Sequence, residues 1–425
     1  MIIVTSPPGR FSGELNVPGD KSITHRAVML GALARGVTEI RGYLNAGDCH
    51  STIKCLQSLG VKISGRGDRL FIEGRGMKLN EPAGVLDAGN SATTARLLLG
   101  ILAGQNFDAS VTGDQSLLRR PMKRVVEPLR LMGASVKGEG DYLPLTITGG
   151  ILKPIDHVNA GASAQVKSAI LLAGLFAEGI TTVEEPYQSR NHTELMLGHF
   201  GANLQSDNFR VTLQGRPVLY GRPIRVPGDI SAAAFIMVAA TIIPGSEVLV
   251  KNVGVNPTRS GIIEALCSMG ADIVLRQENM WGKEPVADIL IRGGAGLKGI
   301  TIGGAMIPRL IDEIPVLAVA ALLAKGKTVI SGAGELRVKE SDRITALAGQ
   351  LTRLGAVITE TEDGMIIEGG AKLKGSDLDS CDDHRIAMAL AVAGLAARGE
   401  TAVQGAEVIN ISFPGFMAAL RSLTL

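Results

Sequence analysis

The stretch VPGDKSITHRAVML, from Val17 to Leu30, has a counterpart in VPGDISAAAFIMVA, from Val226 to Ala239. Each copy runs from a Pro-Gly-Asp turn into a helix of small apolar residues, and then through a glycine into a β-branched strand. Only the first copy adds Lys21, His25 and Arg26. The turn is therefore scaffold, and the basic residues of the first copy need a separate explanation.

The same order of elements occurs four more times. The further copies are GNSATTARLLLGILAG from Gly89, GASAQVKSAILLAGLFAEG from Gly161, IDEIPVLAVAALLAKG from Ile311 and DDHRIAMALAVAGLAARG from Asp382. A second, amphipathic helix repeats in phase and ends at Gly60, Gly133, Gly201, Gly270 or Gly355. Such a glycine provides the left-handed C-cap that other residues resist. Six copies in constant order predict six α/β units, three packed around one axis in each half of the chain.

The two VPGD segments mark the starts of the two halves and predict the domain boundaries. We expect one domain over residues 19–227 and a discontinuous one over residues 1–18 plus 228–425, with hinges near 17–20 and 225–228. The last copy has no strand after its final helix, whereas the strand around GELNV, residues 13–17, is unmatched. This amino-terminal strand is expected to complete the last repeat.

Composition excludes several classes of function. The chain has 425 residues, with 43 Lys+Arg against 41 Asp+Glu and 3% aromatic residues, which disfavours a nucleic-acid or membrane-surface partner. Its four cysteines show no metal-site spacing and are expected to be reduced. The longest apolar run, residues 231–243, is too short to span a bilayer, and the first residues lack signal-peptide features. We expect a soluble, cytoplasmic protein.

Polar residues gather at the starts of the otherwise apolar helices and in the segments between them. Singly, each is more often a cap or a solvated charge than a functional group. As a set they predict a cleft between the two halves for substrates with phosphates and carboxylates, because helix starts and guanidinium groups bind anions. Acids there suggest proton transfer. The set comprises Lys21, Ser22, Arg26, Asn90, Arg120, Ser163, Gln165, Arg190, Asp312, Lys339, Glu340, Arg343, His384 and Arg385.

One motif is set aside. Gly294–Gly299 matches the dinucleotide-binding pattern G-x-G-x-x-G, but it lies between two strand-like segments with no helix after it. We interpret it as a hairpin turn.

Seven motifs together carry a family resemblance. In order, VPGDKSITHR, GNSATTARLLLG, RRPM, SRNHTE, ELRVKESDR, DDHRIAMA and SFPGF resemble the 5-enolpyruvylshikimate-3-phosphate (EPSP) synthases over essentially the whole chain. The resemblance implies two inverted α/β barrels, each of three βαβαββ units. It also implies transfer of the enolpyruvyl group of phosphoenolpyruvate to the 5-hydroxyl of shikimate-3-phosphate, in the pathway to aromatic amino acids. Neither metal nor cofactor is expected, and the family suggests a monomer.

The resemblance also implies roles for individual residues. Lys21, Asp312, Glu340 and His384 are expected to be catalytic, with Asp312 taking the proton of the 5-hydroxyl and Glu340 with Lys21 moving the proton at the pyruvyl methyl carbon. Expected shikimate-3-phosphate ligands are Lys21, Ser22, Arg26, Ser163, Ala164, Gln165, Arg190, Asp312 and Lys339. Expected phosphoenolpyruvate ligands are Lys21, Asn90, Ala92, Arg120, Gln165, Arg343 and Arg385.

Three departures from the family pattern matter, and one of them is Glu335, where some members have Asn. Many members have Gly where this chain has Ala92, and the added methyl group should crowd the inhibitor glyphosate more than phosphoenolpyruvate. Some members have Lys where this chain has Ile411, so one phosphate contact must be absent or supplied elsewhere.

Two alternatives remain at this stage. UDP-N-acetylglucosamine enolpyruvyl transferases share the fold, but they usually carry a reactive cysteine in the loop that corresponds to TGDQSLLRRP, residues 112–121, which has none. A non-catalytic anion-binding or RNA-end-processing protein on a similar scaffold is disfavoured by the low aromatic content and by Asp312 and Glu340.

Overall fold

The computed structural model describes residues 1–207 and 209–424 and divides into two units. Unit 1 contains Met1–Pro18, Pro227–Met280 and Pro285–Leu425. Unit 2 contains Gly19–Val226 together with Trp281–Glu284, the tip of a hairpin whose strands otherwise belong to unit 1. No pattern in the sequence predicted that this tip belongs to unit 2.

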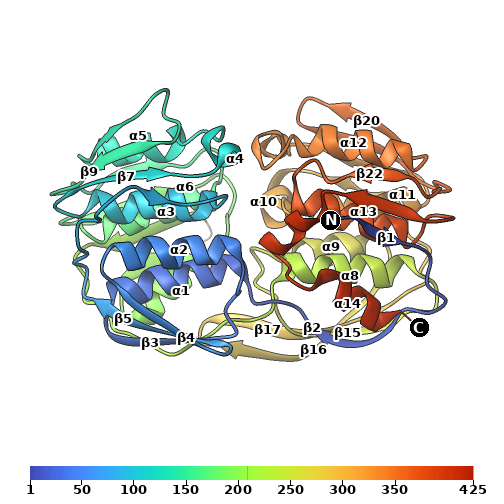
Figure 1. The fold of residues 1–425 in the computed structure, drawn as a ribbon, viewed down its shortest axis with the longest axis horizontal. Coiled ribbons are helices and arrows are strands. Elements are labelled where there is room, and N and C mark those ends of the chain that lie inside the picture. Colours follow the sequence, from blue (N-terminus) through green and yellow to red (C-terminus); the bar gives the residue numbers. More distant parts are fainter. Residues whose placement is uncertain (208, 425) are drawn as a thin grey trace. The chain divides into compact units, whose positions relative to one another are not determined.

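Unit 2 alternates short strands with helices (Figure 1). Its helices are α1 Lys21–Leu33, α2 Gly47–Ser58, α3 Ala92–Ala103, α4 Gln115–Leu118, α5 Lys123–Leu131, α6 Ala164–Gly174 and α7 His192–Phe200. Its strands are β3 Arg35–Arg41, β4 Lys62–Arg66, β5 Arg69–Arg75, β6 Leu86–Asp87, β7 Asp108–Thr112, β8 Ser135–Lys137, β9 Leu145–Thr148, β10 Asp156–Val158, β11 Ile180–Glu184, β12 Leu204–Ser206, β13 Arg210–Gln214 and β14 Ile224–Arg225.

Unit 1 repeats the same plan (Figure 1). Its α-helices are α8 Ile230–Ile242, α9 Gly261–Ser268, α10 Ile307–Leu310, α11 Ile314–Leu323, α12 Arg343–Arg353, α13 His384–Gly394 and α14 Phe416–Leu423, and its 3₁₀ helices are η1 Gly304–Met306, η2 Gly334–Val338 and η3 Ala406–Ile411. Its strands are β1 Ile3–Thr5, β2 Ser12–Asn16, β15 Glu247–Gly254, β16 Asp272–Trp281, β17 Glu284–Arg292, β18 Thr301–Ile302, β19 Lys327–Ile330, β20 Val357–Thr361, β21 Gly364–Glu368, β22 Asp377–Asp379 and β23 Thr401–Gln404.

Each repeat builds one small mixed sheet. In the second repeat β6 pairs in parallel with β7, β7 pairs antiparallel with β9, and β9 pairs antiparallel with β8. The third and fifth repeats have the same strand order. Residues of β9 alternate between buried and exposed, as expected when one face of a sheet covers a core and the other meets water.

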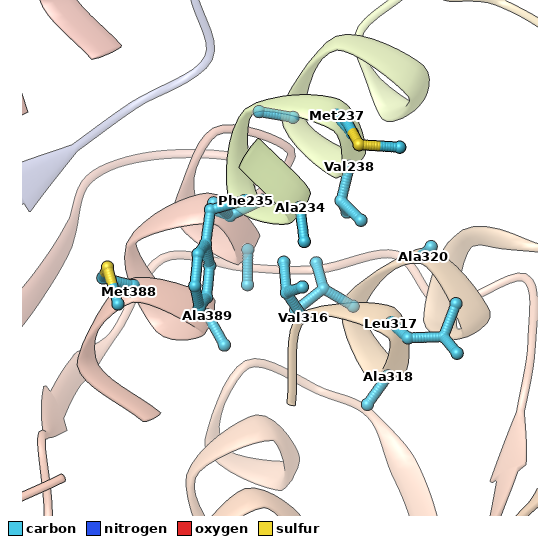
Figure 2. Packing of buried hydrophobic residues seen from close by; sticks show 14 of the residues in the cluster. Ala234, Phe235, Met237, Val238, Val316, Leu317, Ala318, Ala320, Met388 and Ala389 are labelled. Carbon is cyan, nitrogen blue, oxygen red and sulfur yellow. The ribbon is translucent and has the colours of Figure 1, made fainter. Parts of the chain in front are cut away.

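The first helix of each repeat forms the core of its unit. These helices, α1, α3 and α6 in unit 2 and α8, α11 and α13 in unit 1, are buried on almost every side. Most of their residues are small and apolar, and the polar residues of α1, α3, α6 and α13 lie mainly in the first turns. Figure 2 shows side chains of α8, α11 and α13 converging, among them Phe235, Val316 and Ala389. Packed this closely, the three helices hold their ends in fixed positions.

The strands that close the incomplete repeats come from distant parts of the chain. Residues 12–16, β2, lie parallel to β15 in the fourth repeat, so the GELNV strand does not complete the last repeat as expected. That place is taken by β1, which pairs antiparallel with β23. In unit 2, β14 lies parallel to β3 and completes the first repeat. Strands so far apart in sequence leave no local pattern from which their pairing could be predicted.

Two smaller expectations were also tested. The five glycines predicted as C-caps all have positive φ, between 84° and 107°. The interpretation of Gly294–Gly299 as a hairpin was wrong, because β17 pairs with β15 and β16 whereas β18 pairs with β19. This segment connects two different sheets.

Among residues 1–207 and 209–424, no helix is long and apolar enough to cross a membrane.

Candidate active site

The start of α1 presents the first predicted cation. Asp20 caps the helix, and its Oδ1 accepts a hydrogen bond from the Ile23 amide at 2.8 Å. Lys21, the first residue of α1, donates from Nζ to Asp48 Oδ2 of α2 at 2.9 Å. The side chains are 17% and 9% exposed, so this ion pair is only partly screened by water. Lys21 is thus held at the helix start by a carboxylate.

A chain of hydroxyl groups joins α1 to α2 and α3. His25 Nδ1 lies 2.6 Å from Thr52 Oγ1, which lies 2.7 Å from Thr94 Oγ1. Burial lowers the pKa of His25 well below its ordinary value, and the charges of Lys21 and Arg26 lower it further. His25 is therefore neutral near pH 7 and adds no like charge between the two cations.

Arg26 is buried and ties three helices together. Its Nε donates to Thr193 Oγ1 of α7 at 2.6 Å, Nη2 donates to Ser168 Oγ of α6 at 2.8 Å, and Nη1 donates to the Ser22 carbonyl at 3.1 Å. The sequence predicted Arg26 as an anion ligand. The structure also gives it a second task, which is to fix α1 against α6 and α7.

The starts of α3 and α6 meet at Gln165. Its Nε2 donates to Thr93 Oγ1 at 2.9 Å, and its Oε1 accepts a hydrogen bond from Arg96 of α3. Ser163 is the N-cap of α6, and its own side chain makes no capping bond. Before it, Ala162 has φ 45°, a left-handed conformation unusual for a non-glycine residue. This strained approach sets the direction of the first free amides of α6.

A second polar group surrounds the start of α3. Asn90 donates from Nδ2 to Asp114 Oδ2 at 2.7 Å and accepts from Arg120 Nη2 at 3.1 Å. Arg120 reaches Asn90 although the two are 30 residues apart in sequence. It also donates to Ser116 Oγ at 2.9 Å. Ala92, the first residue of α3, lies two residues after Asn90 in sequence.

In unit 1, Arg343 joins the starts of α12 and α13. Its Nε donates to Asp383 Oδ2 at 2.7 Å, and its Nη2 donates to Glu340 Oε2 at 2.6 Å. Burial opposes the charge of Arg343, but Asp383 and Glu340 outweigh it and raise the pKa of the guanidinium. Burial would raise the pKa of Asp383, yet the charge of Arg343 holds it below its ordinary value. Both groups are therefore ionised although Arg343 is 1% and Asp383 0% exposed.

Asp312 lies between two guanidinium groups. Arg343 Nη1 is 3.4 Å from Asp312 Oδ1, and Arg385 Nη2 is 3.6 Å from Oδ2. Arg385 also donates from Nη1 to the Asp312 carbonyl at 2.9 Å. The Asp312 carboxylate is 16% exposed, so a bound molecule can reach it beside the two cations.

The remaining predicted residues of unit 1 surround this group. His384 is the first residue of α13 and is 1% exposed. Lys339 precedes Glu340 and has a 25% exposed side chain. Packing lowers the pKa of Lys339, although the charges of Asp312 and Glu335 act in the opposite direction. Its ammonium group therefore gives up a proton more readily than that of an exposed lysine.

The structure groups the predicted residues within each unit. Unit 1 brings together Asp312, Glu340, Arg343 and Arg385, with Lys339 and His384 adjoining them in sequence. Unit 2 links Arg26 to α6 and α7, and Gln165 to α3, whereas Arg190 lies half-buried on the loop before α7.

Sequence reasoning missed Asp48 and Thr193 as parts of the site, and although it singled out Arg96 and Asp383 as polar groups of their repeats, it did not pair them with Gln165 and Arg343. Asp48 and Asp383 are acids at helix starts, a pattern that a capping role already explains.

Comparisons with known proteins show the family of the chain. The family model "EPSP synthase (3-phosphoshikimate 1-carboxyvinyltransferase)" matches residues 5–420. The chain belongs to the EPSP synthase family. A 3-phosphoshikimate 1-carboxyvinyltransferase of Pelotomaculum thermopropionicum is 57% identical over 418 residues, covering 97% of this chain and 96% of the relative. One from Thermoanaerobacter sp. (strain X514) is 55% identical over 407 residues, covering 96% of each chain.

A solved structure agrees as well. EPSP synthase from Acinetobacter baumannii superposes with a TM-score of 0.88 at 46% identity, covering 99% of this chain and 98% of that one. The chain therefore has the two-domain enolpyruvyl transferase fold of the EPSP synthase family, as the motifs predicted.

Proposed function

We propose that this chain transfers the enolpyruvyl group of phosphoenolpyruvate to the 5-hydroxyl of shikimate-3-phosphate, and that the residues grouped above carry out the reaction. Family membership over the whole chain supports the activity. The observation that supports the assignment of residues is the Asp312, Arg343 and Arg385 group, which places an acid beside cations that suit an anionic substrate. The site is proposed to act in a cytoplasmic, monomeric enzyme.

The residues of unit 2 are assigned to shikimate-3-phosphate. Ser163, Ala164 and Gln165 lie at the start of α6, where unpaired amides and partial positive charge favour a phosphate. Lys21, Ser22 and Arg26 at the start of α1, with Arg190, supply further donors. Two residues of unit 1, Asp312 and Lys339, complete the set. Asp312 is assigned as the base that the 5-hydroxyl requires.

Phosphoenolpyruvate is assigned to the guanidinium groups. Arg120, Arg343 and Arg385 bear fixed positive charges for its phosphate and carboxylate, and charge-assisted bonds to such groups are strong. Asn90 orients Arg120 through the bond at 3.1 Å. The set is completed by Lys21, Ala92 and Gln165.

The proposed chemistry uses these residues for proton transfer and for binding charge. Asp312 takes the proton of the 5-hydroxyl of shikimate-3-phosphate while the hydroxyl oxygen attacks C2 of phosphoenolpyruvate. Glu340 and Lys21 deliver a proton to C3. A tetrahedral ketal forms, and removal of a proton from the new methyl group expels phosphate. His384, buried at the start of α13, is assigned to the same proton-transfer step. The fixed cations stabilise the charge that develops.

One experiment tests both the activity and the proton transfer. Phosphate release is measured with shikimate-3-phosphate and phosphoenolpyruvate, with UDP-N-acetylglucosamine as the control acceptor. We expect turnover only with shikimate-3-phosphate, and a loss of about 10²-fold or more in kcat for Glu340→Gln. Turnover with the nucleotide sugar would contradict the function. Near-normal kcat in a folded Glu340→Gln variant would remove Glu340 from the mechanism.

A further inference from the structure

Unit 2 contains a buried charged cluster that the proposed mechanism does not use. Lys167 of α6, Glu185 after β11 and Glu194 of α7 have side chains only 2%, 3% and 4% exposed. We call these three residues, with Asn159 and Ser189, the Lys167 cluster. Burying charges costs several kcal/mol per ion before pairing, and apolar residues of similar size are often at least as stable. The cluster therefore calls for a role other than stability.

The centre of the cluster is one ammonium group between two carboxylates. Lys167 Nζ is 2.8 Å from Glu185 Oε2 and 2.8 Å from Glu194 Oε1. Burial opposes its charge, but the two glutamates outweigh burial and raise the pKa of Lys167, so it stays protonated. Glu194 Oε2 is buried and accepts no hydrogen bond from the residues that the structure describes. An arrangement with an unsatisfied oxygen is not optimised for folding alone.

Glu185 connects the ammonium group to two segments of the proposed shikimate-3-phosphate site. It accepts hydrogen bonds from the Ser189 amide at 3.1 Å and from Ser189 Oγ at 2.7 Å. Ser189 directly precedes Arg190. On its other side, Asn159 Nδ2 lies 2.7 Å from Glu185 Oε1 and 3.0 Å from the carbonyl of Ser163, the N-cap of α6. One carboxylate thus fixes both the loop of Arg190 and the start of α6.

Glu194 and Lys167 connect the cluster to the third segment. Thr193, next to Glu194, accepts a hydrogen bond from Arg26 Nε at 2.6 Å. Ser168, next to Lys167, lies 2.7 Å from Thr193 Oγ1 and accepts from Arg26 Nη2 at 2.8 Å. The ion pair between α6 and α7 therefore holds the two hydroxyl groups that orient Arg26.

We propose that the Lys167 cluster is a positioning device, which holds Ser163, Arg190 and Arg26 in the geometry that binds the phosphate of shikimate-3-phosphate. The inference rests on the proposed function, because it takes these three residues as ligands. Ser163 is joined to Glu185 through two hydrogen bonds of Asn159. Arg190 follows Ser189, which bonds to Glu185, and Arg26 bonds to Thr193, which precedes Glu194. A site whose donors are fixed before binding loses less entropy when the ligand arrives. The members of the cluster need not touch the substrate.

The test compares two cluster variants with a control in the full-length protein. Glu185→Gln keeps the size of the side chain but removes its charge, and Lys167→Met removes the ammonium group. Asp141→Asn is the control, because it breaks the 2.8 Å ion pair with Arg130 elsewhere in unit 2. For each, we measure kcat, the KM of both substrates, the Kd of shikimate-3-phosphate alone by calorimetry, and the thermal midpoint.

We expect both cluster variants to raise the KM and Kd of shikimate-3-phosphate by about tenfold, with the KM of phosphoenolpyruvate within about twofold of its original value. The control should change neither. If Glu185→Gln folds, lowers the thermal midpoint and leaves the Kd of shikimate-3-phosphate unchanged, the cluster is structural only and the inference fails. If Lys167→Met does not fold, Glu185→Gln decides the result.

Ser163→Ala and Arg190→Ala separate this inference from the proposed function. Both should weaken shikimate-3-phosphate binding directly. If neither changes the Kd, the ligand assignment is wrong and the inference is overturned with it. If both weaken binding while the cluster variants do not, the assignment stands and only the inference fails.

Discussion

Ala92 shows how one methyl group can separate a substrate from an inhibitor. It opens α3 directly after the cap Ser91 and is two residues from Asn90, which holds Arg120. A side chain at this position lies among the groups proposed to bind phosphoenolpyruvate. An added methyl group should leave a compact substrate in place and crowd a longer one, because closely packed sites discriminate by about 10-fold to 200-fold per methylene-sized group.

We therefore predict that Ala92→Gly lowers the inhibition constant of glyphosate by about tenfold or more while changing the KM of phosphoenolpyruvate much less. Steady-state inhibition of the variant and the parent protein measures this, and the thermal midpoint serves as a control for folding. An unchanged inhibition constant would show that Ala92 does not limit the inhibitor's access.

The elements of unit 2 are fixed by a close approach between α3 and α6. A Cβ atom added at Gly100 of α3 would lie 2.3 Å from the Ala169 carbonyl oxygen of α6, far inside van der Waals contact. The two backbones can approach so closely only because position 100 has no side chain. This contact sets the distance between the helices whose starts meet at Gln165.

We predict that Gly100→Ala destabilises the protein by about 1–3 kcal/mol, because the helices must separate to admit the methyl group. Urea unfolding measures this change. Gly349→Ala is the matched control: Gly349 is exposed within α12, and an added Cβ there meets nothing within 4 Å. It should be neutral or stabilising by up to about 1 kcal/mol. Equal effects of the two variants would contradict the close approach.

At this scale the sequence predicted much of the fold. The six repeats were visible because each has a mostly apolar helix followed by a strand, and five of them have a second helix that ends in glycine; these signals are local. The exchange of β1 and β2 between repeats left no such signal, since β2 pairs with residues 247–251 and β1 with residues 401–403. Partners of buried charges, such as Asp383 for Arg343, were missed for the same reason.

On the scale of the whole molecule, the chain passes out of unit 1 and back within the hairpin of β16 and β17. Its tip, Trp281–Glu284, belongs to unit 2, whereas the rest of both strands belongs to unit 1. Glu284 Oε1 lies 2.7 Å from His192 Nδ1, and the Arg225 guanidinium lies 3.4 Å from the centre of the Trp281 ring. The chain therefore changes unit at this tip as well as at the two VPGD segments.

Trp281 is the single tryptophan of the chain, so its fluorescence reports on the tip. We predict that Glu284→Gln loosens the tip, because it weakens the bond to His192, and that acrylamide then quenches the emission more strongly. Glu278→Gln, an exposed position on β16, should leave quenching unchanged. Equal quenching in all three proteins would show that the bond to His192 does not hold the tip.

The pairing of β1 and β2 also has a consequence for synthesis of the chain on the ribosome. Residues 12–16 leave the ribosome long before their partner, β15, which begins at Glu247, and β1 leaves it long before its partner, which begins at Thr401. By then the continuous part of unit 2, Gly19–Val226, has been made in full. Unit 2 can therefore begin to fold during translation, whereas β1 and β2 stay unpaired and exposed to chaperones or to other chains until their partners have been made.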